Sequence, residues 1–185
     1  MSLKHVADLA VLAQQSAAAL ETPVSRYADL VRATLQAGGT VFFAGNGGSA
    51  AHGQHIATEY VIRYQPVKRR AAAALALSTD SSLITAGAND LGFDEIFARQ
   101  VEALGRAGDL LVLISTSGNS NNLLRAADVA KSRGVKTVGL LAGGGGKLAA
   151  KVDLAIVVPT NDTALAQEIQ LAVDHHVVSV IEAEL

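Results

Sequence analysis

Short apolar segments alternate along this chain with longer segments whose apolar residues recur at helical spacing. The short segments are apolar almost throughout, rather than at every second position, and they lie at Val41–Ala44, Ala72–Leu77, Leu110–Ile114, Thr137–Leu141 and Leu154–Val158. Strands that are buried on both faces and joined by helices have this pattern. The sequence therefore predicts an α/β fold, a three-layer sandwich around a five-stranded parallel sheet.

Helical periodicity dominates both ends of the chain. Apolar residues between positions 4 and 37 recur every three or four residues, and Thr22-Pro23 has the residue types that begin a helix. We therefore expect an N-terminal helical hairpin over residues 1–37 and an α/β core over residues 38–185. A last helix is expected from about Thr163 to Glu182. Because no linker or charge block interrupts the 185 residues, they are predicted to form a single domain.

Two turns rich in glycine and serine follow two of the predicted strands and precede helical segments. They are Gly45–Ser49 and Ser115–Ser120, and the second has four hydroxyl side chains in six residues. Glycine lets the backbone approach a ligand, and the N–H groups at a helix N-terminus bind anions. Two such turns indicate a site for a phosphorylated small molecule. The run Gly143–Gly146 could be a third phosphate loop, but it lacks hydroxyls, so we expect a flexible turn there.

His55 and Glu59 lie four residues apart on the helix predicted after the first turn. At this spacing an imidazole and a carboxylate share a helix face, where they can bind one metal ion or act as an acid–base pair. A surface ion pair is the structural alternative, but the neighbouring anion loop favours a functional role. His52 could be a further ligand or a substrate contact; we expect instead a residue at the pocket edge or facing solvent.

Polar residues also interrupt the apolar pattern of the last predicted helix. Buried imidazole and amide groups need partners, so these residues either make hydrogen bonds between helices or belong to a site. Spacing does not decide which of them converge. They are Gln167, Glu168, Gln170, Asp174, His175 and His176. Elsewhere, Asn89 and Asp90 are predicted to form a turn, with a role beside the hydroxyls of a substrate as the alternative.

The composition excludes several classes of protein. The formal net charge of −2 leaves no electrostatic footprint for nucleic acid or an anionic membrane, and the one basic cluster, Lys68–Arg70, is expected to be a solvated loop. No cysteine is present, which excludes disulfides and thiolate chemistry. The N-terminus lacks the pattern of a signal peptide, and no apolar run reaches about 18 residues. We therefore expect a soluble, cytoplasmic protein.

Five motifs in this order resemble the phosphoheptose isomerase family of the sugar isomerase (SIS) domain superfamily. They are Gly45–Ser49, His55 with Glu59, Ala88-Asn89-Asp90, Ser115–Ser120, and Gln167-Glu168 followed by His175. The resemblance extends from about Leu3 to the C-terminus. It implies an SIS fold and an aldose–ketose isomerase that interconverts sedoheptulose 7-phosphate and D-glycero-D-manno-heptose 7-phosphate through an enediol. It also implies a homotetramer with active sites at subunit interfaces.

The same resemblance assigns roles to individual residues. The phosphate would be held by Ser115, Thr116, Ser117 and Ser120. The sugar would be contacted by Asn46, Gly47, Gly48, Ser49, Asn89 and Asp90, together with the side chains of Glu59 and Gln167. One zinc ion would be bound by His55, Glu59, Gln167 and His175. Glu59 and His175 would also form the acid–base pair.

Two positions depart from the family pattern. An acidic residue usually stands three positions before the first histidine, where this chain has His52, and an aspartate usually stands three before the glutamine, where it has Ala164. Neither is among the implied metal ligands, so isomerisation remains the expected activity. The alternatives are an isomerase of another phosphosugar and a non-catalytic phosphosugar-binding regulator of the type that associates with a replication initiator. The acid–base pair at Glu59 and His175 favours the enzyme.

Overall fold

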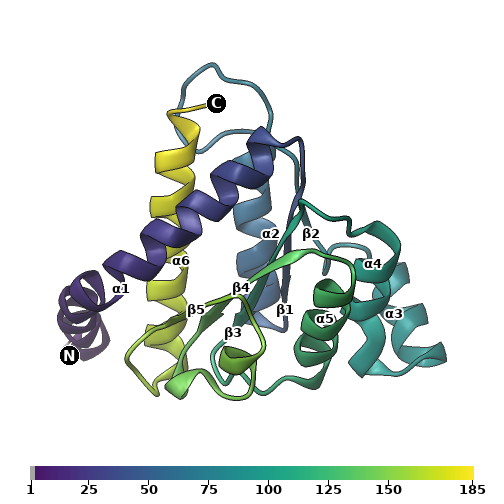
Figure 1. Cartoon of the computed structure of the whole chain (residues 1–185). Helices are drawn as coiled ribbons and strands as arrows, with labels where there is room; N and C mark the ends of the chain where they lie inside the picture. Colours follow the sequence, from purple (N-terminus) through teal and green to yellow (C-terminus); the bar gives the residue numbers. More distant parts are fainter. Residues whose placement is uncertain (1–2) are drawn as a thin grey trace.

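The computed structural model describes residues 3–185 and has three layers, with a five-stranded parallel sheet between two layers of helices (Figure 1). The strand order is β2-β1-β3-β4-β5, and every neighbouring pair is parallel. The strands are β1 (Val41–Gly45), β2 (Ala74–Ala76), β3 (Leu110–Ser115), β4 (Lys136–Leu141) and β5 (Leu154–Val157). The predicted sheet is therefore confirmed. β2 is shorter than predicted because it is an edge strand that pairs with β1 at only three positions.

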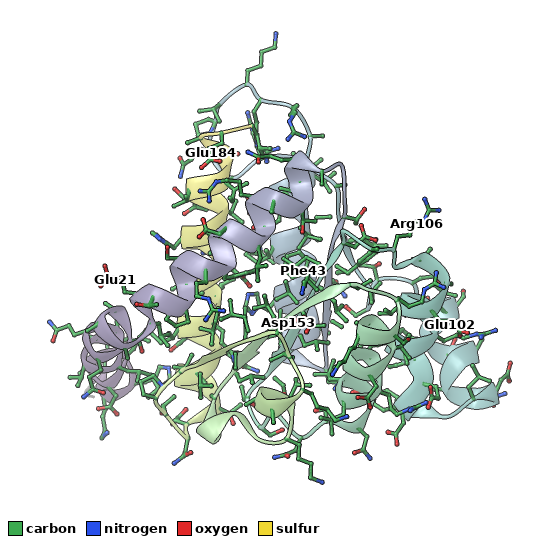
Figure 2. All side chains as sticks on the ribbon, in the orientation of Figure 1. Glu21, Phe43, Glu102, Arg106, Asp153 and Glu184 are labelled. Carbon is green, nitrogen blue, oxygen red and sulfur yellow. The ribbon has the colours of Figure 1, made fainter. Side chains whose placement is uncertain are left out.

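In residues 3–185, six α-helices surround the sheet, with hydrophobic cores on its two faces. α1, α2 and α6 pack on one face, against strand residues such as Phe43 and Val112, whereas α4 and α5 pack on the other, against Phe42 and Leu111. Figure 2 shows Phe43 in the interior, whereas Glu102 lies at the surface. The helices are α1 (Lys4–Gln36), α2 (Gly48–Val61), α3 (Ser81–Asp90), α4 (Ile96–Leu104), α5 (Asn121–Ser132) and α6 (Thr163–Glu182), with short 3₁₀ turns η1 (Phe93–Glu95), η2 (Gly143–Gly145) and η3 (Leu148–Ala150).

The predicted N-terminal hairpin is wrong, because residues 4–36 form the single helix α1 with Pro23 inside it. A proline in a helix interior removes one hydrogen bond and costs about 3 kcal/mol, and it commonly bends the helix. The apolar stripe of α1 continues across Pro23, with Leu20 buried before it and Val24 and Tyr27 buried after it. This continuous packing offsets the cost of the proline. Figure 1 shows that α1 changes direction along its length.

The last helix begins and ends as predicted, at Thr163 and Glu182. Asp162 is its N-cap, and one carboxylate oxygen accepts hydrogen bonds from the backbone N–H groups of Ala164 and Leu165. α6 packs beside both α1 and α2. Of the helices in residues 3–185, none has the length and apolar character needed to cross a membrane.

Candidate active site

The two glycine- and serine-rich turns lie side by side at the carboxyl edge of the sheet. Gly45 of β1 is in register with Ile114 of β3, so the two strands end together. After β1 the chain adds β2 to the sheet on one side of β1. It then crosses back and adds β3, β4 and β5 on the other side. Between β1 and β3 the direction of winding therefore reverses, and in open α/β sheets ligands bind in the crevice at such a point.

Hydrogen bonds between Asn46 and Asn122 connect the first turn to α5, the helix that follows the second turn. Each side-chain amide donates to the other's carbonyl oxygen, over 3.0 Å from Asn46 and 2.9 Å from Asn122. Asn122 is buried in the first turn of α5, whereas Asn46 follows β1. Asn46 therefore ties the first turn to the start of the helix that follows the second. Ser49, the other polar residue of the first turn, is buried at the start of α2.

The hydroxyl turn is organised as an anion-binding loop would be. Ser115 Oγ accepts from the Gly118 N–H over 3.0 Å, and Ser117 Oγ accepts from the Asn119 N–H over 3.2 Å. Ser120 is the residue before α5, but its side chain makes no capping hydrogen bond to that helix. Its hydroxyl and the first N–H groups of α5 face the same helix end, where an anion is stabilised. Thr116 is half-buried in the same loop.

The glycine run supports this loop rather than standing alone as a turn. All four residues of Gly143–Gly146 have positive φ angles, which glycine adopts without strain. The backbone here is so close to Gly118 that a Cβ on Gly118 would overlap the carbonyl oxygen of Gly145. The N–H of Leu148 donates to the Gly118 carbonyl over 2.9 Å. The run is therefore packed against the hydroxyl loop.

His55, Glu59 and His175 meet between α2 and α6. Nε2 of His55 lies 3.0 Å from Nε2 of His175 and 3.6 Å from a carboxylate oxygen of Glu59. One ligand atom from each residue falls within 4.8 Å of the others. The predicted pair at 55 and 59 is thus joined by a histidine from the last helix.

The donor atoms of this cluster fit a zinc ion. Two imidazole nitrogens bound to tetrahedral zinc at 2.0–2.1 Å lie about 3.3 Å apart, close to the separation of the two Nε2 atoms. Three protein ligands of the His and carboxylate type are usual in catalytic zinc sites. Gln167 adjoins the cluster, since it lines a cavity of about 400 Å³ with His52, His55 and Gly48. Its side chain packs on Gly48, where a Cβ would lie 2.8 Å from Nε2.

Burial and the neighbouring His55 lower the pKa of His175 below its ordinary value. The imidazole is therefore neutral at neutral pH, the form that can ligate a metal ion or accept a proton. The ring of Tyr64 stacks on that of His175, with centroids 5.4 Å apart and planes 27° apart. Tyr64 was not among the residues predicted from sequence, because it lies in the connection after α2 and no spacing links it to α6.

His52 is buried, which contradicts the expectation of a solvent-facing residue, but it does line the cavity. Its Nε2 lies 2.8 Å from a carboxylate oxygen of Asp174, although the two groups are not aligned for a hydrogen bond. Asp174 is fully buried, and its other oxygen accepts from the Tyr27 hydroxyl over 2.7 Å. The carboxylate beside His52 thus comes from α6.

Of the remaining polar residues of α6, Glu168 also lines the cavity beside Gln167, whereas Gln170 and His176 lie outside its lining. Gln170 is buried and donates to the Leu140 carbonyl over 2.9 Å, Glu168 pairs with His5 of α1, and His176 lines a groove between α6 and α1. Asn89 and Asp90 are the last two residues of α3 and are exposed, so the predicted turn there is wrong. The helix continues because no residue stops it before Gly92, whose φ is 94°.

Comparison with known proteins agrees with this geometry. The SIS domain family matches residues 4–142. A phosphoheptose isomerase of Chlorobium phaeovibrioides is 53% identical over 158 residues, covering 84% of this chain and 74% of the relative; one of Paramagnetospirillum magneticum is 45% identical over 180 residues, covering 97% and 91%. Among solved structures, the phosphoheptose isomerase of Neisseria gonorrhoeae superposes with a TM-score of 0.91 at 39% identity, covering 97% of this chain and 96% of that one. That of Francisella tularensis gives 0.94 at 32% identity, covering 97% and 95%.

Proposed function

The chain belongs to the SIS domain family and, within it, to the phosphoheptose isomerases, and on this premise we propose how its site performs that reaction. The enzyme is an aldose–ketose isomerase that interconverts sedoheptulose 7-phosphate and D-glycero-D-manno-heptose 7-phosphate. The observation that carries the assignment of residues is the meeting of Glu59 and His175 from two helices, α2 and α6.

The hydroxyl loop is proposed to bind the phosphate of the sugar. Its hydroxyls and the N-terminus of α5 supply hydrogen-bond donors and partial positive charge. Binding the remote phosphate holds the reacting carbons in place, so that part of the binding energy lowers the barrier to proton transfer. The residues assigned to phosphate are Ser115, Thr116, Ser117 and Ser120; those assigned to the sugar are Asn46, Gly47, Gly48, Ser49, Asn89, Asp90, Glu59 and Gln167.

Glu59 and His175 are proposed to move the protons of the reaction. One group removes a proton from the carbon next to the carbonyl while the other donates a proton to the carbonyl oxygen, which gives the enediol. The reverse transfers at the neighbouring carbon and oxygen then give the isomeric sugar, so no proton or electron is gained or lost. A carboxylate and a neutral imidazole that both reach the reacting carbons and oxygens suffice for both steps.

One zinc ion per chain is proposed to be bound by His55, Glu59, Gln167 and His175. When bound, such an ion polarises a carbonyl group and stabilises the negative charge that develops on its oxygen. The separation of the imidazole nitrogens and the position of Gln167 in the adjoining cavity support this ligand set.

The enzyme is proposed to be a homotetramer that works in the cytoplasm. An apolar groove runs between α1 and α6, lined by residues such as Ala17, Leu20 and Val173. Near the N-terminus of α1, Val6 and Val11 are more than half exposed. Apolar surface of this kind is what a second subunit covers. A cytoplasmic location fits the substrate, because a charged sugar phosphate does not cross a lipid bilayer unaided.

The assignment is tested by incubating the purified protein with sedoheptulose 7-phosphate and following the products by NMR. In deuterium oxide, an enediol route incorporates deuterium at the carbon next to the carbonyl. We expect a new heptose 7-phosphate that carries this label. Binding of the sugar without any turnover or exchange would instead support the non-catalytic regulator, and turnover of a different phosphosugar would redefine the substrate.

A further inference from the structure

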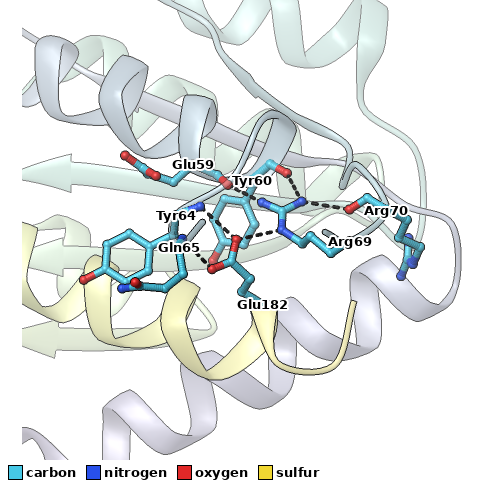
Figure 3. Close-up of polar contacts among 7 residues, drawn as sticks. All are labelled: Glu59, Tyr60, Tyr64, Gln65, Arg69, Arg70 and Glu182. Atoms are coloured by element: carbon cyan, nitrogen blue, oxygen red, sulfur yellow. Dashed lines mark hydrogen bonds and ion pairs between the residues drawn. The ribbon is translucent and has the colours of Figure 1, made fainter. Parts of the chain in front are cut away.

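A buried ion pair fastens the connection between α2 and β2 to the end of α6. Nε of Arg69 lies 2.8 Å from a carboxylate oxygen of Glu182, and the two side chains are only 4% and 3% exposed (Figure 3). Arg69 belongs to the basic cluster that the sequence predicts to be a solvated loop, and for this residue the prediction is wrong. Burying two charges is costly unless further hydrogen bonds satisfy both groups.

Both charged groups are satisfied, and their other partners belong to the connection and to the end of α2. Glu182 accepts hydrogen bonds from the backbone N–H groups of Tyr64 and Gln65, over 2.8 and 2.7 Å. Arg69 donates to the backbone carbonyls of Glu59 and Tyr60, and to its neighbour's carbonyl. Burial acts to raise the pKa of Glu182, but the bonds from Arg69 and the two N–H groups outweigh it and lower the pKa. The carboxylate is therefore ionised at neutral pH.

Two of these contacts lead to the His55–Glu59–His175 cluster, one through Glu59 itself and the other through Tyr64, which touches His175. The carbonyls of Glu59 and Tyr60 lie in the last turn of α2, where carbonyls have no partner within the helix. Arg69 supplies that partner and so fixes the backbone from which the Glu59 side chain projects. Through its N–H bond to Glu182, Tyr64 is held where its ring stacks on His175. Figure 3 shows Glu59 and Tyr64 on the same side of the ion pair.

We propose that the Arg69–Glu182 ion pair is a positioning device for the acid–base pair, and that Tyr64 is the positioning residue through which it acts on His175. This inference rests on the proposed function, in which Glu59 and His175 transfer the protons. Arg69 reaches Glu59 through its backbone carbonyl, and Glu182 reaches His175 through Tyr64. The ion pair thereby sets the separation between the side chains of Glu59 and His175, which α2 and α6 contribute independently. Transfer of a proton depends steeply on such a separation.

The kinetic test compares Tyr64→Leu and Glu182→Gln with two reference variants. Tyr64→Phe keeps the stacked ring, and Glu184→Gln breaks the exposed Arg32–Glu184 pair only two residues further along the chain. We expect kcat for sedoheptulose 7-phosphate to fall roughly 10- to 100-fold in Tyr64→Leu and Glu182→Gln, with KM within about threefold of wild type. Tyr64→Phe and Glu184→Gln should retain wild-type kcat. Wild-type kcat in Tyr64→Leu, which leaves the ion pair intact, would overturn the proposal even if Glu182→Gln fails to fold.

A second test reads the position of His175 without any turnover. The chain has only five histidines, so the ring-proton resonances of His175 can be assigned by comparison with His175→Asn. In protein stripped of metal by a chelator, the stacked Tyr64 ring shifts these resonances. We expect Glu182→Gln to move them toward their positions in Tyr64→Leu, although Tyr64 is still present, whereas Glu184→Gln leaves them unchanged. Wild-type resonances in folded Glu182→Gln would refute the positioning device, and an inactive wild-type protein would refute the proposed function instead.

Discussion

Glu59 and His175 are the two residues proposed to transfer protons. Each lies on a helix, and neither is fully buried. Glu59 faces His55 on its own helix, but it meets His175 only because α2 packs beside α6. An ionisable pair brought together in this way from two helices fits the proposed acid–base chemistry better than a role in stability.

Replacing Glu59 by glutamine removes the ionisable group but preserves shape and hydrogen-bonding capacity. We expect turnover in Glu59→Gln to fall by roughly 10²–10⁴-fold, the usual contribution of one acid–base group, while phosphosugar binding persists. Steady-state kinetics, calorimetric binding and elemental analysis of the same sample separate lost chemistry from lost metal. Glu102→Gln, on the exposed face of α4, is the control and should behave as wild type. Near-normal turnover in both Glu59→Gln and His175→Asn would place the chemistry elsewhere.

The hydroxyls of the loop after β3 give a separate prediction about affinity. The double variant Ser117→Ala with Ser120→Ala should bind the phosphosugar more weakly, by on the order of 1.5–3 kcal/mol for each hydrogen bond lost to the charged phosphate. Stability should change little, since the Ser120 side chain makes no cap bond to α5 and the bond from the Asn119 N–H to Ser117 Oγ is exposed to solvent. Titration calorimetry in the Glu59→Gln background measures affinity without turnover. Ser132→Ala, at the other end of α5, is the matched control; equal affinities in the two variants would exclude this loop as the phosphate site.

At the scale of elements, the site is built from loops that support one another. The hydroxyl loop follows β3, and the glycine run that packs against it follows β4, the next strand in the sheet. The Lys147 N–H donates to the side chain of Asn119, and the Leu148 N–H donates to Gly118, so two bonds hold the loops together. The geometry of the proposed phosphate site therefore depends on Gly143–Gly146, a segment with no polar side chain of its own.

Gly118→Ala tests this dependence. The φ angle of Gly118 is 63°, which disfavours alanine by about 1–2 kcal/mol, and the added Cβ would also overlap Gly145. Gly38 is the matched control, because its φ is 77° but a Cβ there meets nothing within 4 Å. We expect both variants to lose stability in chemical denaturation, Gly118→Ala by more, and only Gly118→Ala to lose phosphosugar affinity. Equal effects of the two substitutions would show that the loops do not depend on their contact.

Over the whole molecule, the two faces of the sheet differ in what their helices leave exposed. The face carrying α1 and α6 also carries the apolar groove between those helices, whereas α4 and α5 share a core on the other face. α6 contributes His175 to the cluster proposed to bind zinc and His176 to the groove. Subunit association across the groove would therefore involve α6, the helix that contributes His175 to the proposed acid–base pair.

The proposed homotetramer gives a prediction about the groove. Ala17 lines it, whereas Ala18, the next residue of α1, is exposed outside its lining. A charge buried at an apolar interface is costly, so Ala17→Glu should dissociate the tetramer, and Ala18→Glu should not. Light scattering during size-exclusion chromatography measures the mass of each variant. A wild-type monomer would contradict the tetramer, and a tetrameric Ala17→Glu would remove the groove from its interfaces.

The local pattern of residues by itself determined the layered fold and the two turns rich in glycine and serine. Short apolar runs between helical segments are typical of strands covered on both faces, and β1 to β5 lie at the five predicted runs. Glycine and hydroxyl residues after β1 and β3 mark the turns, because their effect on the backbone is local. Together with the i, i+4 spacing of His55 and Glu59, these features made the site recognisable from the chain alone.

Only the tertiary structure decided how distant residues combine. α1 continues through Pro23 because its apolar stripe packs along its length, which the local signal of Thr22-Pro23 does not reveal. Arg69 is buried because Glu182 of α6, far away in the chain, offers it a carboxylate. His52 of α2 is buried beside Asp174, which is also in α6. Spacing along one helix fixes which residues share a face, but the contacts between helices depend on how they pack. For that reason spacing alone does not show that His175 meets Glu59, and the contact of Tyr64 with His175 could be read only from the folded chain.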